Sequence, residues 1–136
     1  MLMTTIHFNG NCDDAIGFYK GAVGARVKVI NYAKDAPPEF AAENPEMPPN
    51  FVMYSEISMF GTFVVMSDGA TEPLSVTEGN FNLMVTVETP EEVQELFDKL
   101  KTGGKASVPP APQFWATMYA VVTDKFGLTW QITTPD

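Results

Sequence analysis

The chain has 136 residues, a formal net charge of −9 at pH 7 and 45% hydrophobic residues. This length and composition indicate a folded protein of one domain, or of two small modules that share a core, and argue against disorder. The acidic balance excludes nucleic acid and anionic membranes as expected partners, because both carry negative charge and would be repelled.

The first elements along the chain are a strand and a helix. Residues 4–8 form a short β-rich run, and Asn11 is a candidate N-cap for the helix that follows. Gly24 is suited to end that helix as a C-cap glycine. The apolar stripe of the helix recurs at helical spacing and comprises Cys12, Ala15, Ile16, Tyr19 and Val23.

The rest of the first half predicts three strands and a long loop. Residues 25–32 alternate as a strand does, and residues 34–50 hold five prolines without any periodicity. We expect this proline-rich segment to be a loop. Residues 51–59 and 62–68 then form a hairpin that turns at Phe60-Gly61.

The second half repeats this order after a polar linker at 69–78. Residues 80–87 predict a strand, and Thr89 and Pro90 open the clearest helix of the chain, which ends at Gly103-Gly104. Residues 105–108 predict a short strand and 109–112 a proline-rich loop. A last hairpin turns around Phe126-Gly127.

The two hairpins resemble each other in sequence. Residues 53–68 and 118–133 both open with Met-Tyr and both reach Phe-Gly seven or eight residues later. Each half therefore reads as a strand, a helix and three strands, and an internal repeat of this length indicates two copies of one unit that bury their faces together. We expect one α+β domain over residues 1–136, made of two βαβββ modules at 1–68 and 79–136.

Four segments carry a resemblance to a known family. They are F-x-G-N-C-x-D-A-I-x-F-Y at 8–19, G-x-x-V-V-M-S-D at 61–68, F-W-A at 114–116 and V-T-D-K-F-G-L-T-W-Q-I at 122–132. In this order they resemble the PhnB-like branch of the glyoxalase/bleomycin resistance/extradiol dioxygenase superfamily, also called the vicinal oxygen chelate superfamily. The resemblance implies curled mixed sheets that form cups, and a homodimer.

The resemblance also bears on metal binding. In metal-dependent relatives four side chains, usually His, Gln or Glu, hold a divalent ion inside a cup. The matching positions here fall on Thr4, Tyr54, Phe81 and Gln131, and the chain has one His and one Cys in total. Metal sites need several converging His, carboxylate or thiolate groups, so we expect no metal and no other cofactor.

Six residues are the expected contacts of a small organic ligand in an apolar cup: Ile6, Phe8, Tyr54, Phe81, Trp115 and Gln131. The family register would turn Ile6 and Phe8 toward the cup and His7 toward the helix. Trp115 is suited equally to stacking on a ligand and to capping a core, and Tyr54 is interpreted as a contact because it replaces a family histidine. The sequence names no catalytic residue.

Several other side chains have structural interpretations. Trp130 is expected in the core, Asp68 and Asp124 are expected to bond turn backbones, and Cys12 is expected to be inert. His7 is interpreted as structural, although a histidine serves as an acid or base near neutral pH. Glu56 shares a strand face with Tyr54 and is expected at a solvent-facing edge.

Three functions remain open on the sequence. The leading hypothesis is a glyoxalase/bleomycin-resistance-like protein that binds a small organic molecule without a catalytic metal. The alternatives are a metal-dependent lyase, isomerase or dioxygenase-type enzyme, and a structural module whose cups are filled by side chains. The single cysteine and the absence of a signal-peptide pattern favour a cytoplasmic protein.

Overall fold

The computed structural model describes residues 1–74 and 81–135, and it divides into two compact units, Met1–Pro73 and Leu74–Asp136. We call these units the first and the second module. Part of the predicted linker at 69–78, and the first residue of the strand predicted at 80–87, lie outside the described residues. That the two modules share one domain stays a prediction.

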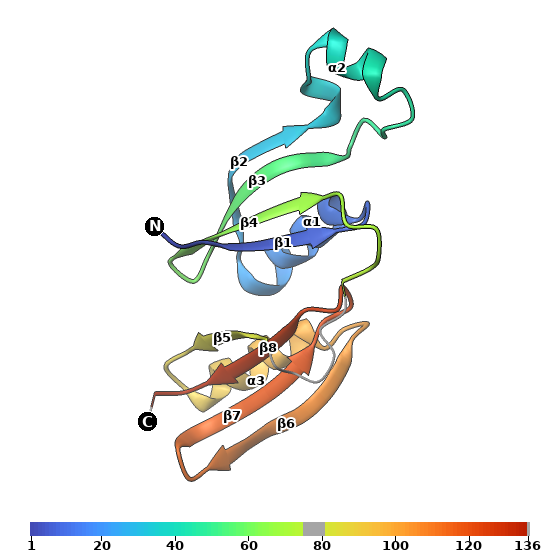
Figure 1. The fold of residues 1–136 in the computed structure, drawn as a ribbon. Coiled ribbons are helices and arrows are strands. Elements are labelled where there is room, and N and C mark those ends of the chain that lie inside the picture. Colours follow the sequence, from blue (N-terminus) through green and yellow to red (C-terminus); the bar gives the residue numbers. More distant parts are fainter. Residues whose placement is uncertain (75–80, 136) are drawn as a thin grey trace. The chain divides into compact units, whose positions relative to one another are not determined.

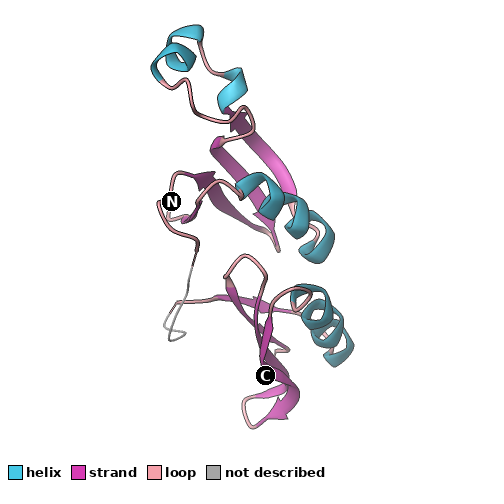
Figure 2. Ribbon diagram, turned by 90° about the vertical axis from the view of Figure 1, so that its right-hand side faces the viewer, coloured by secondary structure: helices cyan, strands magenta, loops and turns pink. Residues whose placement is uncertain are grey.

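The first module is a four-stranded mixed sheet with one long helix (Figure 1). Its elements are β1 (Thr4–Phe8), α1 (Cys12–Val23), β2 (Arg26–Tyr32), β3 (Val52–Met59) and β4 (Thr62–Asp68). The strands lie in the order β1-β4-β3-β2, with β1 parallel to β4 and the other pairs antiparallel. Figure 2 shows α1 on one face of this sheet, so each strand has a helix-covered face and an open face.

Helix α1 packs through the stripe that its sequence predicts, with one change. Cys12, Ala15, Ile16 and Tyr19 are buried, and Ala22 takes the place expected for Val23. Gly24 ends the helix in a left-handed conformation with a φ of 68°, as a C-cap glycine does. Asn11 stands at the N-cap position as predicted, but its side chain makes no capping hydrogen bond.

The segment between β2 and β3 is not a plain loop, which corrects the prediction for residues 34–50. It contains a 3-10 turn at Ala33–Asp35 and the short helix α2 (Pro38–Glu43). Pro38 stands at the first helical position, where its fixed φ and missing N–H favour a helix start. The side chain of Asn44 donates to the carbonyl of Phe40 at 2.9 Å and closes the last turn.

The second module has the same architecture. Its elements are β5 (Leu83–Thr86), α3 (Pro90–Leu100), β6 (Lys105–Gln113), β7 (Ala116–Thr123) and β8 (Thr129–Thr133). The strand order is β5-β8-β7-β6, with β5 parallel to β8. Helix α3 buries Val93, Leu96, Phe97 and Leu100, and the Thr89 hydroxyl accepts from the Glu92 N–H at 3.2 Å, so both predictions for this helix are confirmed.

Strand β6 runs through the segment predicted as a proline-rich loop at 109–112. Proline lacks the N–H that a central strand needs, but β6 is the edge strand of its sheet and pairs with β7 alone. The pairing shifts register three times along β6, between Ala106 and Gln113. An edge position with bulges therefore accommodates prolines that a local reading assigns to a loop.

The structure confirms the internal repeat and the α+β fold of two βαβββ modules. The strand order β1-β4-β3-β2 becomes β5-β8-β7-β6 when each element is replaced by its counterpart. The two Met-Tyr hairpins are β3–β4 and β7–β8, as the sequence predicts. Among the described residues, no helix is long and apolar enough to cross a membrane.

Candidate functional site in the second module

The open face of the second module is formed by alternate residues of its four strands. Strand pairing places Met84 beside Gln131, Gln131 beside Val121 and Tyr119 beside Thr133. Residues one step along, such as Trp130 and Ile132, are buried on the helix side. The open face is therefore built from neutral side chains at its centre.

Three side chains of this face are joined into one cluster. The rings of Trp115 and Tyr119 meet edge to face, with centroids 5.4 Å apart. The Tyr119 hydroxyl donates to Oε1 of Gln131 at 2.9 Å, and Nε2 of Gln131 donates to Oδ1 of Asn82 at 3.3 Å. We call Trp115, Tyr119 and Gln131 the aromatic–amide cluster. It combines two aromatic surfaces with an amide whose orientation is fixed from both ends.

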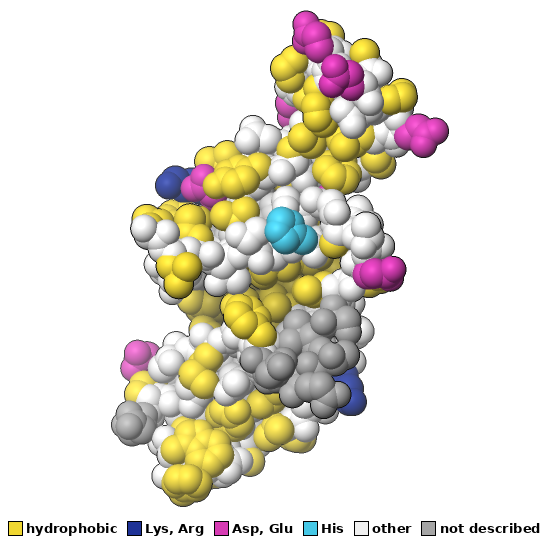
Figure 3. Space-filling view, viewed as in Figure 1, with side chains coloured by type: hydrophobic (Ala, Val, Ile, Leu, Met, Phe, Trp, Pro, Cys, Tyr) yellow, Lys and Arg dark blue, Asp and Glu magenta, His cyan; other side chains and the backbone are white. Residues whose placement is uncertain are grey.

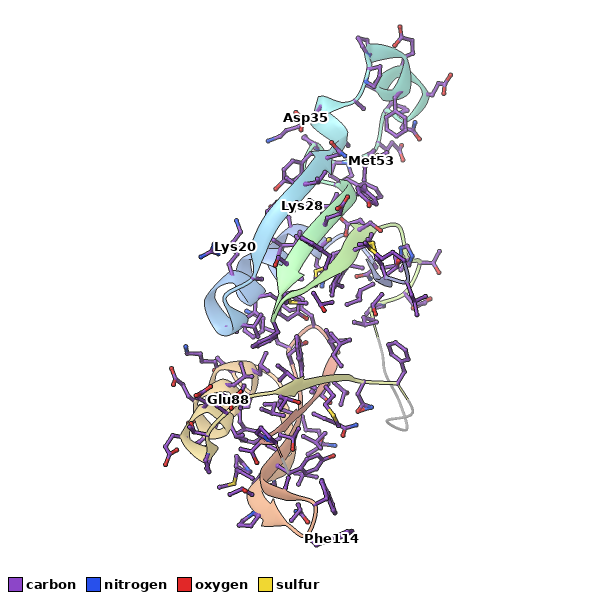
Figure 4. The ribbon with its side chains drawn as sticks, turned by 90° about the vertical axis from the view of Figure 1, so that its left-hand side faces the viewer. Lys20, Lys28, Asp35, Met53, Glu88 and Phe114 are labelled. Atoms are coloured by element: carbon purple, nitrogen blue, oxygen red, sulfur yellow. The ribbon has the colours of Figure 1, made fainter. Side chains whose placement is uncertain are left out.

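The cluster adjoins a concave surface at the tip of the β6–β7 hairpin. A cavity of about 540 Å³ is lined by residues 112–117, which include Phe114 and Trp115. Phe114 packs its ring edge to face against Trp115 at 4.7 Å yet is 98% exposed, and Figure 4 shows it at the end of the hairpin. Aromatic side chains exposed beside a hollow are typical of sites that cover a ligand.

The hydrogen-bond directions indicate what the cluster accepts. Because the Tyr119 hydroxyl donates its proton to Gln131, its oxygen keeps lone pairs for a donor from a ligand. The faces of Trp115 and Tyr119 favour a planar apolar group. The geometry thus suits a neutral aromatic molecule that carries a hydroxyl or an N–H.

The first module presents a different open face. His7 is exposed on it and its Nδ1 lies 3.0 Å from Oγ of Ser67, the residue paired with it on β4. Figure 3 shows the histidine on the sheet face turned toward the viewer, with α1 behind that sheet in the same view of Figure 1. The expectation that His7 faces the helix is therefore wrong.

The expected position of Ile6 and Phe8 is corrected in the same way. They are 5% and 1% exposed and belong to the core on the helix side of β1. The expected register is one residue out of phase, and since strand side chains alternate, this moves every residue of β1 to the other face. Ile6 and Phe8 therefore do not lie on the open face of the first module.

The remaining sequence candidates are on the surface. Tyr54 is partly exposed on β3 and donates to Glu56 at 3.0 Å, and Glu56 lies 3.7 Å from the ammonium of Lys28. Phe81 precedes β5 and is exposed. Trp115 and Gln131 are joined through Tyr119, while Tyr54 is in the other module and no contact of Phe81 with the cluster is seen among the described residues.

The two aspartates predicted as structural are confirmed as such. Asp68 is buried and accepts from the N–H groups of Gly10, Cys12 and Val52 at 2.8–3.0 Å, which also caps the start of α1. Asp124 is buried as well, and it accepts from Nε1 of Trp130 at 2.9 Å and from two N–H groups of its own turn. Each carboxylate satisfies buried donors of its module.

Cys12 is buried against Asp68, and burial, with a smaller effect of the Asp68 and Asp13 charges, raises the pKa of its thiol to about 12. The thiolate is the reactive form of cysteine.

We therefore expect native protein to react with Ellman's reagent at least 100-fold more slowly than protein unfolded in guanidinium chloride. The absorbance of the aromatic thiolate that the reagent releases follows the reaction, and equal rates in the two states would contradict the buried position.

Comparison with known proteins places the chain in a family. A family model described as 3-demethylubiquinone-9 3-methyltransferase matches residues 1–133. Protein YjdN of Escherichia coli strain K12 is 30% identical over 133 residues, which cover 93% of this chain and 90% of that protein. The chain belongs to this family. The family description names a reaction, but membership alone does not bring that reaction to this chain.

Solved structures share the fold of this PhnB-family protein. A PhnB protein from Bacillus cereus is 22% identical, with 98% of each chain covered and a TM-score of 0.79. A glyoxylase/bleomycin resistance protein/dioxygenase domain from Frankia is 12% identical, with 100% of this chain and 97% of that chain covered and a TM-score of 0.69. These similarities establish the glyoxalase/bleomycin resistance fold, which the sequence predicts.

The donor chemistry of this PhnB-family protein does not fit the metal centre of its metal-dependent relatives. Within residues 1–74 and 81–135, no three His, Cys, Asp or Glu side chains gather closely enough to hold a metal ion. Three of the expected ligand positions hold a tyrosine, a phenylalanine and a glutamine, namely Tyr54, Phe81 and Gln131. The fourth, Thr4, shares the helix-side phase of Ile6 and Phe8 and so is turned away from the open face. Three or four converging strong donors are the rule for such centres.

The contacts expected from the sequence leave out two contributors to these faces. Tyr119 joins Trp115 to Gln131, and the repeat that pairs it with Tyr54 was a signal for a shared position. Ser67 contacts His7 through a pairing 60 residues apart in the chain, which only the sheet topology discloses.

Proposed function

We propose that this PhnB-family protein binds a small, uncharged aromatic molecule on the open face of its second module, without a catalytic metal. The observation that carries the proposal is the aromatic–amide cluster, in which Trp115, Tyr119 and Gln131 present two rings and one oriented amide. Binding of this kind needs an apolar surface and a few fixed polar groups.

The chemistry of the site favours a phenol or an aromatic amine over a charged ligand. The cluster holds no ionised side chain, and a charged ligand would lose its hydration without gaining an ionic partner. The Tyr119 oxygen is suited to accept from the ligand hydroxyl. Since the family description names demethylubiquinone, whose reduced ring is a methoxylated phenol, methoxylated phenols are the first probes.

Replacing Trp115 with alanine is expected to weaken binding of such a phenol about tenfold, because one aromatic contact of this kind contributes roughly 1–1.5 kcal/mol. Saturation-transfer difference NMR on chelator-treated protein identifies the bound probe and a titration gives its affinity. Phe60→Ala is the matched control, since Phe60 is 48% exposed and Trp115 46%, and Phe60 lies in the first module.

Two outcomes would overturn the proposal. Equal affinities for the Trp115→Ala and Phe60→Ala variants would show that the cluster does not form the site. Binding that appears only after loading with Mn²⁺, Ni²⁺ or Zn²⁺ would favour the metal-dependent alternative of the same superfamily instead.

A further inference from the structure

A line of polar side chains crosses the open face of the first module. Strand pairing sets His7 of β1 beside Ser67 of β4, and Asn31 of β2 beside Tyr54 of β3. In the β3–β4 pair Glu56 lies opposite Val65, and continuing this antiparallel register by two residues brings Tyr54 opposite Ser67. We call His7, Ser67, Tyr54 and Asn31 the polar row. One residue comes from each strand of the sheet.

The equivalent positions of the second module hold neither a histidine nor an asparagine. There the pairing Thr86–Thr133, Thr133–Tyr119 and Tyr119–Ala111 gives two threonines, a tyrosine and an alanine. The two modules fold alike, so a histidine and an asparagine at these points are not required by the sheet. The polar row therefore points to a chemical role of the first module.

The acidic group next to the row is already neutralised. Glu56 accepts from the Tyr54 hydroxyl at 3.0 Å and lies 3.7 Å from the Lys28 ammonium. That ammonium also lies 4.5 Å from the centre of the Phe63 ring, which holds it over the same face. Asp68, the acid at the end of β4, is buried and bonded to backbone groups. Glu56 and Lys28 together therefore add no net charge beside the row.

After these internal bonds, donors outnumber acceptors. The Nε2 atom of His7 and the amide of Asn31 have no hydrogen-bond partner among the described residues, and Lys28 keeps protons beyond its one ion pair. In the tautomer whose Nδ1 accepts from the Ser67 hydroxyl, Nε2 carries the ring proton and can donate it to a ligand. A carboxylate, which offers two oxygens and several lone pairs, satisfies such a set of donors.

We propose that the polar row of the first module binds the carboxylate of a small organic acid. His7 and Asn31 donate to its oxygens, Ser67 holds the ring of His7, and the ammonium of Lys28 donates protons that its ion pair with Glu56 leaves over. This site is made of first-module residues alone, the aromatic–amide cluster of second-module residues alone, and neither proposal depends on the other.

The single histidine of the chain makes a direct test possible, because its ring gives the only imidazole signals in a nitrogen-15 NMR spectrum. Sodium acetate is the probe, titrated at constant ionic strength, and acetamide is the uncharged control of the same shape. We expect saturable shifts of the His7 ring signals with acetate, with half-saturation below about 10 mM, and none with acetamide. Shifts that stay linear with acetate, or that acetamide reproduces, would overturn the proposal.

Two lysine variants separate a built site from a general charge effect. Lys28→Ala is expected to weaken acetate binding at least fivefold. Lys20→Ala removes the same charge from α1, on the helix side of the sheet, and is expected to leave the affinity unchanged; Figure 4 labels both residues. Asn31→Ala is expected to act like Lys28→Ala. Equal effects of the two lysine variants would contradict the proposed site.

Discussion

Replacing Asp68 with alanine is expected to lower the free energy of unfolding by about 3–5 kcal/mol. The carboxylate accepts from three N–H groups, those of Gly10, Cys12 and Val52, and two of these hydrogen bonds are buried. Without it the buried N–H groups of Cys12 and Val52 lose their acceptor, and each unsatisfied buried donor costs about 1–3 kcal/mol. Urea unfolding followed by far-ultraviolet circular dichroism measures the loss.

Asp68→Asn is the matched control for this variant. It keeps one acceptor oxygen at nearly the same place, so its loss should be smaller than that of Asp68→Ala. A loss below about 1 kcal/mol for the alanine variant would contradict the structural role of Asp68, since that is the size of an ordinary exposed hydrogen bond.

Replacing Phe8 with alanine is expected to cost about 3–5 kcal/mol of unfolding free energy, whereas His7→Ala should cost less than about 1 kcal/mol. Phe8 is almost fully buried and its removal leaves a cavity in the core, while the neighbouring His7 is exposed on the open face. The two residues are neighbours on one strand, and the structure places them on opposite faces of the sheet. The difference between the two losses therefore tests the register of β1.

The same urea experiment checks this pair. A larger loss for His7→Ala than for Phe8→Ala would restore the register expected from the family resemblance, with Phe8 toward the open face. Nearly equal losses would show that β1 is not the alternating strand that the structure describes.

The fold was accessible from the sequence because its signals are local or repeated. Helix α3 carries its start signals in Thr89 and Pro90, and the Met-Tyr hairpins show the repeat directly. The sequence does not determine in the same way which residues of β1 point toward the helix and which toward the open face. A five-residue strand holds too few alternating residues to fix its phase, and the deciding partner, Ser67, is 60 residues away.

The candidate sites show the same limit. Trp115 and Gln131 could be named from the sequence, since both stand in segments that resemble the family. Their link through Tyr119 depends on hydrogen-bond and ring geometry across β7 and β8. The predicted strand ends at residue 108, whereas β6 continues to Gln113. Prolines indicate a loop in a sequence, and only the sheet topology shows that this strand lies at an edge, where prolines are tolerated.

The two modules use one architecture for two kinds of surface. In the first, the open face carries His7, Glu56 and Lys28, and in the second the equivalent face is neutral around Tyr119 and Gln131. Both modules fold with the same pattern of buried residues. The residues of the open faces are not part of that pattern and can differ between the two copies. We infer that the first module is specialised for an acidic group and the second for an aromatic one.

The measurement that tests the central proposal most directly is a chemical-shift map of chelator-treated, nitrogen-15-labelled protein titrated with a methoxylated phenol. The account predicts saturable shifts at the Trp115 indole, the Gln131 side-chain amide and the backbone of Tyr119, while the buried Trp130 indole stays unchanged. Shifts confined to other residues, or shifts that require an added divalent metal, would contradict it.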